Sequence, residues 1–170
     1  LIMGETAEIL ARQYGITREE SDAFALDSQH KAEAAQKAGR FDAEIALVTV
    51  TERGKTVRVT ADEHPRPGTT IELLRKLPLT FPMVEGHDGI ITAGSASGIT
   101  DGGAALVPAS SDFAASRGLT PIATITGWAS AGVDPRMMGI GPVPAIKKLE
   151  QRTGLSLAHF DLFELNEAFA

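Results

Sequence analysis

Residues 92–102 read Thr-Ala-Gly-Ser-Ala-Ser-Gly-Ile-Thr-Asp-Gly, a run of small residues that directly follows the apolar pair Ile90 and Ile91. Small side chains let a backbone approach a ligand closely and offer its amides to a carbonyl or a phosphate. The middle residue of Gly94-Ser-Ala-Ser-Gly98 is Ala96, so the segment is not a nucleophile elbow, which requires Ser there. No Gly-Lys-Ser/Thr follows, which excludes a P-loop. Two interpretations stay open: a structural tight turn, or a loop that binds a ligand.

The chain after this run alternates short apolar or β-branched segments with helical ones. Such alternation implies right-handed crossovers, and therefore a mostly parallel sheet covered by helices. Asn166 and Glu167 follow the last expected strand, at the carboxyl edge where open α/β sheets bind ligands. A helix N-cap by Asn166 is the plainer alternative, and the two are compatible. We expect strands at 104–107, 121–128 and 161–165, and helices at 111–117 and 144–152.

The chain before this run is mostly helical. Apolar residues recur at helical spacing over residues 3–14, and Gly15 follows where a left-handed C-terminal cap would sit. Thr17-Arg-Glu-Glu20 has the form of a capping box and opens a second helix that stops at Gly39. The acidic residues Glu19, Glu20 and Asp22 are most simply the charged first turn of that helix. We also expect a hairpin from 45–51 and 56–60, a short helix at 71–77, and loops at 62–68 and 81–89.

The composition narrows the class of partner. The chain has 170 residues with 16 Lys and Arg against 22 Asp and Glu, a formal net charge of −6, and no basic cluster dense enough to follow a nucleic-acid backbone. No apolar run approaches the roughly 20 residues that a membrane span needs, so we expect a soluble protein. The histidines His30, His64, His87 and His159 are scattered without metal-ligand spacing, and no metal site is expected.

The chain contains no cysteine, which excludes a disulfide, a thiolate zinc site and a cysteine nucleophile within this stretch. It opens on Leu-Ile-Met and closes on Asn166-Glu-Ala-Phe-Ala170, so both ends are expected to be cut, and no leader peptide is visible.

Five segments, in chain order, resemble the thiolase family. They are Met3-Gly-Glu-Thr-Ala-Glu8, the run 16–35, Thr92 to Gly102, Asp134-Pro-Arg-Met-Met-Gly-Ile-Gly-Pro142 and Asn166-Glu-Ala-Phe-Ala170. The resemblance implies an α/β fold with α-β-α-β-α layers, incomplete here, and an inserted helical-plus-hairpin loop domain that covers coenzyme A. Residues 1–88 would be that loop domain, residues 89–119 the end of the N-terminal half, and residues 120–170 the start of the C-terminal half.

The resemblance also implies roles for individual residues. Asn166 matches the family asparagine that orients a water in an oxyanion hole, which makes it the expected catalytic residue. Ser97 would meet the pantetheine of coenzyme A and Arg66 its nucleotide end, while Met138 would shape the acyl pocket. Other positions that line the coenzyme A tunnel are Met3, Ala168 and Phe169. Acyl-chain preference stays open, because Ser95 stands where many members have Asn and Ile2 where short-chain members often have His.

The resemblance implies that the full-length protein transfers acyl groups between coenzyme A thioesters, by thiolysis of 3-ketoacyl-CoA or by condensation of acetyl-CoA. The family's nucleophilic cysteine, its Gly-His-Pro histidine and its second cysteine are absent here, so we expect them before Leu1 and after Ala170, and the segment alone to be inactive. A noncatalytic thiolase-like protein that binds acyl-CoA or lipid is the alternative; a ketoacyl synthase is disfavoured by the covering domain. We expect no cofactor beyond the coenzyme A thioester substrate, a homodimer or homotetramer, and a cytoplasmic location.

Overall fold

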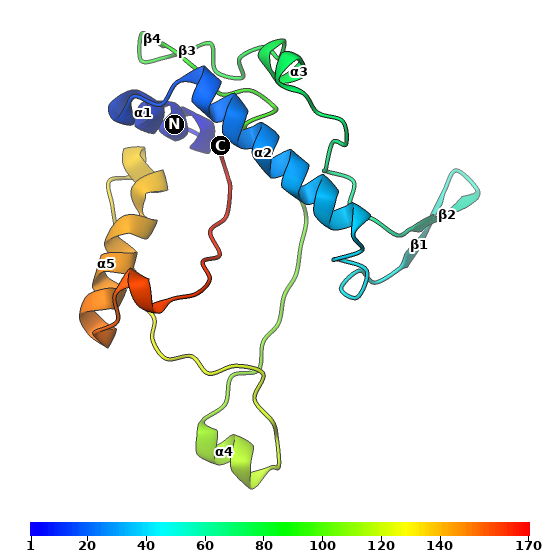
Figure 1. Ribbon diagram of the computed structural model, residues 1–170, viewed down its shortest axis with the longest axis vertical. Helices are drawn as coiled ribbons and strands as arrows, with labels where there is room; N and C mark the ends of the chain where they lie inside the picture. Colours follow the sequence, from blue (N-terminus) through cyan, green and yellow to red (C-terminus); the bar gives the residue numbers. More distant parts are fainter. The chain divides into compact units, whose positions relative to one another are not determined.

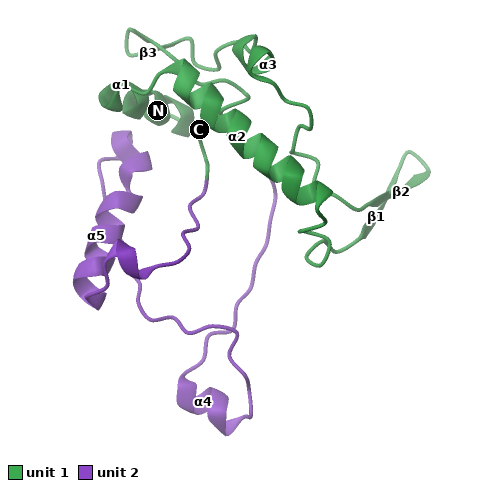
Figure 2. Ribbon diagram, in the orientation of Figure 1, with its two compact units in different colours: residues 1–98, 167–170 green, residues 99–166 purple.

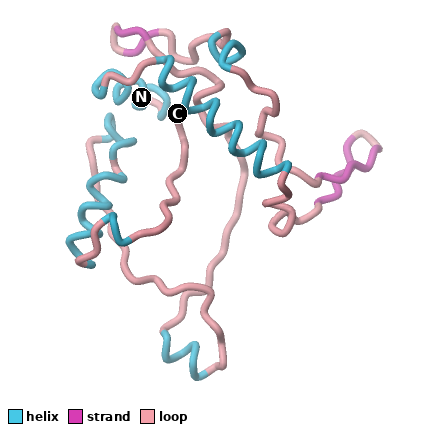
Figure 3. Tube along the Cα trace, in the orientation of Figure 1, coloured by secondary structure: helices cyan, strands magenta, loops and turns pink.

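The computed structural model describes residues 1–170 of the protein (Figure 1). The chain divides into two compact units, one made of residues 1–98 with 167–170 and the other of residues 99–166 (Figure 2). Strands occur only in the first unit, between residues 48 and 88, and loops connect short helices in the second (Figure 3). The division expected near residues 88 and 119 stays a prediction.

Helix α1 spans Met3–Tyr14 and ends at Gly15, whose φ of 67° is left-handed and whose N–H bonds the carbonyls of the preceding turn. The predicted helix and cap are confirmed. Its buried face contains Gly4, Glu8 and Ala11, which share one side because they stand three or four positions apart. A Cβ on Gly4 would lie 2.1 Å from Cε2 of Phe81, so only glycine lets that ring pack on the helix.

Helix α2 spans Arg18–Lys37 and begins with the predicted capping box. The Glu20 N–H donates to Thr17 Oγ1 at 3.2 Å, and the Thr17 N–H donates to the Glu20 carboxylate at 2.8 Å. The expectation that Asp22 is simply part of a charged first turn is wrong. Asp22 is 1% exposed and accepts a bond of 2.8 Å from Arg18 Nε, because its position faces the protein interior.

Helix α3 spans Ile71–Arg75 and is capped by the Thr70 hydroxyl. It lies beside α2, where Arg18 Nη2 donates to the carbonyls of Leu74 at 2.7 Å and Leu77 at 3.4 Å. The predicted short helix is confirmed, although its regular part ends at Arg75.

The predicted hairpin is formed by β1 (Val48–Glu52) and β2 (Lys55–Val59), which pair antiparallel. Arg53 and Gly54 join them, both with positive φ, as in the turns that match strand twist. The loop predicted at 81–89 is wrong in part. The two-residue strands β3 (Met83–Val84) and β4 (His87–Asp88) pair there across a turn in which Glu85 and Gly86 also have positive φ.

The second unit contains the predicted helices. Helix α4 spans Ser111–Ser116, and α5 spans Pro142–Thr153 and ends at left-handed Gly154. Two 3-10 helices, η1 (Pro135–Ile140) and η2 (Leu157–His159), flank α5 in the chain.

The strands predicted at 104–107, 121–128 and 161–165 are not formed, and no parallel pairing occurs among residues 1–170. The apolar side chains of these segments, which we expected to be buried in a sheet, are exposed: Leu106 at 91%, Ile122 at 104% and Leu162 at 74%. A strand needs neighbours for its N–H and C=O groups, and this chain supplies none beside these segments.

Segment 127–130 is attached to α5. Arg152 Nη1 donates to the Trp128 carbonyl at 3.0 Å, and Lys148 Nζ donates to the Ser130 carbonyl at 3.0 Å. The Arg152 guanidinium also lies 5.3 Å from the centre of the Trp128 ring. A Cβ on Gly127 would lie 2.6 Å from Thr153 Cγ2, so glycine allows this close approach.

Candidate functional site

The small-residue loop is a closed turn. Thr92 has no exposed surface, its N–H donates to Ser95 Oγ at 3.0 Å, and its Oγ1 accepts from the Gly94 N–H at 3.1 Å. The Ser95 N–H donates back to the Thr92 carbonyl at 3.2 Å. A Cβ on Gly94 would lie 2.6 Å from Leu74 Cδ2, so the loop packs directly under α3. The run is thus a tight turn, and a rigid turn can also present its backbone to a ligand.

The end of the chain pairs with this loop. The Ser97 N–H donates to the Ala168 carbonyl at 3.0 Å, and the Ala170 N–H donates to the Ser95 carbonyl at 2.8 Å. Ala96 and Phe169 face each other between these bonds as an antiparallel bridge. The structure thus joins the two motifs that the sequence singled out, with Ser97, Ala168 and Phe169 on adjacent backbones.

Helix α2 holds the paired end of the chain. Ser21 Oγ, on a residue with 1% exposure, donates to the Ala170 carbonyl at 2.8 Å. Further along α2, Ser28 Oγ donates to the Glu167 carboxylate at 2.6 Å.

The loop that contains Arg66 lies along α2 and meets the small-residue loop. The Arg66 N–H donates to Gln29 Oε1 at 2.9 Å, and the Arg66 side chain is exposed. The imidazole of His64 packs on Gly98, because a Cβ there would lie 1.8 Å from His64 Cε1. The structure therefore sets the Arg66 loop beside the residue that follows Ser97.

Glu33 anchors the same loop from α2. Its carboxylate accepts from Lys37 Nζ at 2.5 Å and from the Gly68 N–H at 3.3 Å. These two bonds, the Lys37 bond first, hold the pKa of Glu33 below its ordinary value.

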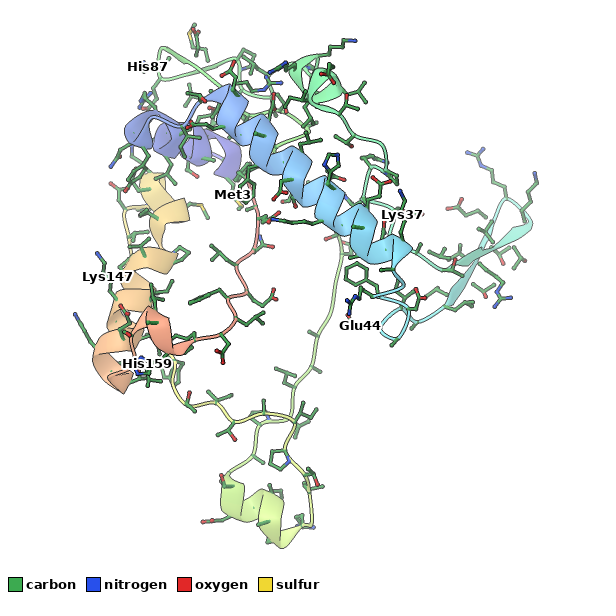
Figure 4. The ribbon with its side chains drawn as sticks, viewed as in Figure 1. Met3, Lys37, Glu44, His87, Lys147 and His159 are labelled. Carbon is green, nitrogen blue, oxygen red and sulfur yellow. The ribbon has the colours of Figure 1, made fainter.

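The remaining predicted residues lie elsewhere in the chain. Met3 is the first residue of α1 and is 53% exposed (Figure 4). Met138 lies in η1 of the unit 99–166 and is 43% exposed. Asn166 is the last residue of that unit and is exposed. The functional roles given to all of these residues stay predictions.

Other features that could indicate a function are a metal site, a membrane-spanning helix and a further pocket. No three His, Asp or Glu side chains gather as metal ligands would, and the four histidines are exposed. No helix has the length and apolar character required to cross a membrane. A hollow lined by 125–128 with Arg152 and Thr153 contains none of the residues predicted to bind a ligand.

One buried carboxylate escaped the sequence analysis. Glu8 is 5% exposed and accepts bonds from the N–H groups of Ile90 and Ile91. The signal was present, because this acidic residue lies one turn from the small residues Gly4 and Ala11 on the buried side of the helix.

Two family models cover nearly all of the chain. The model described as "Thiolase, N-terminal domain" matches residues 1–112, and the model described as "Thiolase, C-terminal domain" matches residues 119–170. The chain belongs to the thiolase family.

Known thiolases match this thiolase chain along its whole length. The β-ketoadipyl-CoA thiolase of Pseudomonas putida is 52% identical over 169 residues, which are 99% of this chain and 41% of that protein. The crystal structure of Bacillus anthracis acetyl-CoA acetyltransferase matches with a TM-score of 0.88 at 48% identity, over 99% of this chain and 42% of its own. The crystal structure of human mitochondrial 3-ketoacyl-CoA thiolase in complex with CoA matches with a TM-score of 0.82 at 45% identity. The match covers 99% of this chain and 41% of that chain.

These matches confirm the predicted thiolase-like α/β fold in incomplete form. The chain spans about two fifths of the length of the relatives that it matches. Within residues 1–170, the segments predicted as strands at 104–107, 121–128 and 161–165 have no neighbouring backbone to pair with.

Proposed function

We propose that this chain is part of a thiolase that transfers an acyl group between coenzyme A thioesters, by thiolysis of a 3-ketoacyl-CoA or by condensation of two acetyl-CoA molecules. The observation that carries the proposal is the pairing of 95–97 with 168–170, which brings two family motifs onto adjacent backbones. A related structure that holds CoA and matches 99% of the chain supports it.

In this proposal, the residues lie at different parts of the coenzyme A thioester. Ser97 binds the pantetheine arm, and Arg66, whose exposed guanidinium is a phosphate ligand by its chemistry, binds the nucleotide end. Met3, Ala168 and Phe169 line the tunnel, and Met138 shapes the acyl pocket. Asn166 orients a water that stabilises the negative charge developing on the thioester oxygen.

The nucleophile is expected outside residues 1–170, because the chain contains no cysteine. A thiolate attacks a thioester well and needs a neighbouring base, and this chain supplies no thiol to form such a pair. We therefore expect this segment alone to be inactive.

One alternative is a thiolase-like protein that binds acyl-CoA or lipid without turning it over. The two differ at a single point. A catalytic protein carries the nucleophile in the sequence before Leu1, whereas a binding protein carries another residue at that position.

The test uses the full-length protein that contains this sequence. Thiolysis of acetoacetyl-CoA is followed by loss of the enolate absorbance, with CoA as the varied substrate. Asn166→Ala should lower kcat by about 100-fold or more, because one oxyanion-hole donor is worth that much. Ser97→Ala should raise the KM for CoA by about three- to tenfold, the value of one hydrogen bond. Ser111→Ala, on exposed α4, is the matched control.

Full-length protein that binds CoA but releases no acetyl-CoA would establish the binding alternative. Protein that binds neither CoA nor acyl-CoA would refute both.

Assembly is a further proposal that rests on the family resemblance alone: we propose a homodimer or homotetramer, with no cofactor beyond the coenzyme A substrate. We also propose a cytoplasmic location, which the resemblance does not decide. Light scattering of the purified protein and fractionation of the source cells test these proposals.

A further inference from the structure

We propose that Glu8 is a positioning residue for the coenzyme A site, which it shapes without touching the substrate. The proposal rests on the function proposed above. Both carboxylate oxygens bind the backbone just before the small-residue loop: Oε1 accepts from Ile90 at 3.0 Å and from Ile91 at 2.8 Å, and Oε2 accepts from Ile90 at 2.8 Å. Bonds from N–H groups to a charged acceptor are about twice as strong as neutral ones.

The surroundings of Glu8 fit a carboxylate closely. A Cβ on Gly89 would lie 2.0 Å from the Phe81 carbonyl oxygen and 2.7 Å from Glu8 Oε1, so the backbone at 89–91 passes directly over the acid. One turn earlier on α1, the Phe81 ring packs against Gly4. Helix α1 is therefore fixed to residues 81–91 at two levels, by packing at Gly4 and by charge-assisted bonds at Glu8.

The segment that Glu8 binds leads straight to the proposed ligand residues. Ile91 is held on its other side by the Thr80 N–H, which donates to its carbonyl at 2.8 Å. The next residue, Thr92, begins the closed turn that ends at Ser95, and Ser95 and Ser97 carry the pairing with the end of the chain. A shift of the backbone at Ile90 would therefore move Ser97 and the paired residues 168–170 together.

Glu8 also belongs to the helix that begins at Met3. It thus fixes one proposed tunnel residue, Met3, relative to another, Ser97. A misplacement of about 1 Å can lower the rate of a positioned reaction by about 100-fold. Loss of this clamp, which displaces the same residues, should therefore weaken coenzyme A binding.

The test compares Glu8→Gln with Glu5→Gln in the full-length protein. Glu5 lies on the same helix, but its side chain is partly exposed and accepts from the Ile2 N–H at the helix start. Gln at position 8 keeps the size of the side chain and turns an NH2 group toward backbone N–H donors. Glu8→Gln should raise the dissociation constant for CoA, measured by calorimetry, by about 10- to 100-fold. Glu5→Gln should leave it unchanged.

Hydrogen exchange separates positioning from a purely structural role. In Glu8→Gln, the amides of residues 95–97 should exchange faster along with those of 90 and 91. Faster exchange confined to 90 and 91, with unchanged CoA affinity, would overturn the proposal. Glu8→Asp keeps the charge but withdraws it by one methylene, and should fall between the parent and Glu8→Gln. If neither variant yields folded protein, Glu8 supports the fold as a whole and the proposal is overturned.

The two proposals can fail separately. If the unsubstituted protein does not bind CoA, the proposed function is refuted. If it binds CoA and Glu8→Gln binds CoA with the same affinity, only the role of Glu8 is refuted.

Discussion

Arg18 and Asp22 form a buried ion pair one turn apart on α2, and its disruption should weaken the protein strongly. Arg18 Nε lies 2.8 Å from Asp22 Oδ2, with side chains 20% and 1% exposed. Arg18→Met keeps the apolar stem and removes the charge, which leaves the Asp22 carboxylate buried without its cation. Breaking one partner of a buried pair costs about 3–5 kcal/mol. The bonds from Arg18 to the carbonyls of Leu74 and Leu77 are lost as well, so α3 should loosen with it.

The chain offers a matched control on the same helix. Lys31 and Asp27 form another pair one turn apart, but their side chains are 76% and 63% exposed. Exposed pairs contribute little, because water screens them. Lys31→Met should therefore leave the stability of the protein almost unchanged.

The assay is urea unfolding of the full-length protein, followed by circular dichroism. With a slope of at least about 3 kcal/mol/M for a protein of this size, the loss of 3–5 kcal/mol should lower the urea midpoint by up to about 1 to 1.7 M. Arg18→Met with Asp22→Leu should recover most of that loss, because an apolar pair no longer buries a lone charge. An Arg18→Met midpoint equal to that of Lys31→Met would refute the reasoning.

Two further predictions follow from local geometry. The Thr17 N–H, and then its hydroxyl, hold the pKa of Glu20 below its usual 4.5, so Glu20 stabilises the protein above that pH and the contribution is lost as the pH falls through the lowered value. Glu20→Ala should therefore lower the urea midpoint at pH 7, by an amount that shrinks below pH 4.5. Gly98→Ala should push the His64 ring aside and raise the KM for CoA by about tenfold, whereas Gly103→Ala, with open space around it, should not; equal KM values would contradict this packing.

The helices could be predicted from the sequence because their signals are local. Gly15 ends α1 by its left-handed backbone, and Thr17 with Glu20 begins α2 by a reciprocal pair of bonds three residues apart. The hairpin was predictable for the same reason, since Arg53 and Gly54 form its turn. The turn at Glu85 and Gly86 was missed because a glutamate with positive φ is uncommon.

The strands at 104–107, 121–128 and 161–165 could not be settled from the sequence, because a strand is defined by its neighbours. Leu106, Ile122 and Leu162 have the composition of buried strands, yet each is exposed where no second backbone pairs with it. The composition of these segments thus predicts strands, but a strand forms only where a neighbouring backbone is available for pairing.

The sequence predicted the residues of the candidate site, but not the contacts that hold these residues in place. The motifs at 92–102 and 166–170 were found by resemblance, but their pairing joins residues far apart in sequence and carries no local signal. Glu8 was overlooked, and Asp22 was assigned to a charged first turn, because charged side chains are normally expected in solvent. Both are buried, Glu8 against the backbone of Ile91 and Asp22 beside Arg18.

The contacts of the first unit span very different lengths of chain, and this sets an order for its assembly on the ribosome. The Arg18 bond to Leu74 joins residues 56 positions apart, and the Glu8 bond to Ile91 joins residues 83 positions apart. The Ser21 bond to Ala170 spans 149 positions. At about 5–20 residues per second, translation of that interval takes roughly 7 to 30 s. The backbone of 95–97 pairs with 168–170, about 75 positions later, and so waits roughly 4 to 15 s for its partner. Until Ala170 emerges, the nascent chain has an unpaired edge that chaperones could protect.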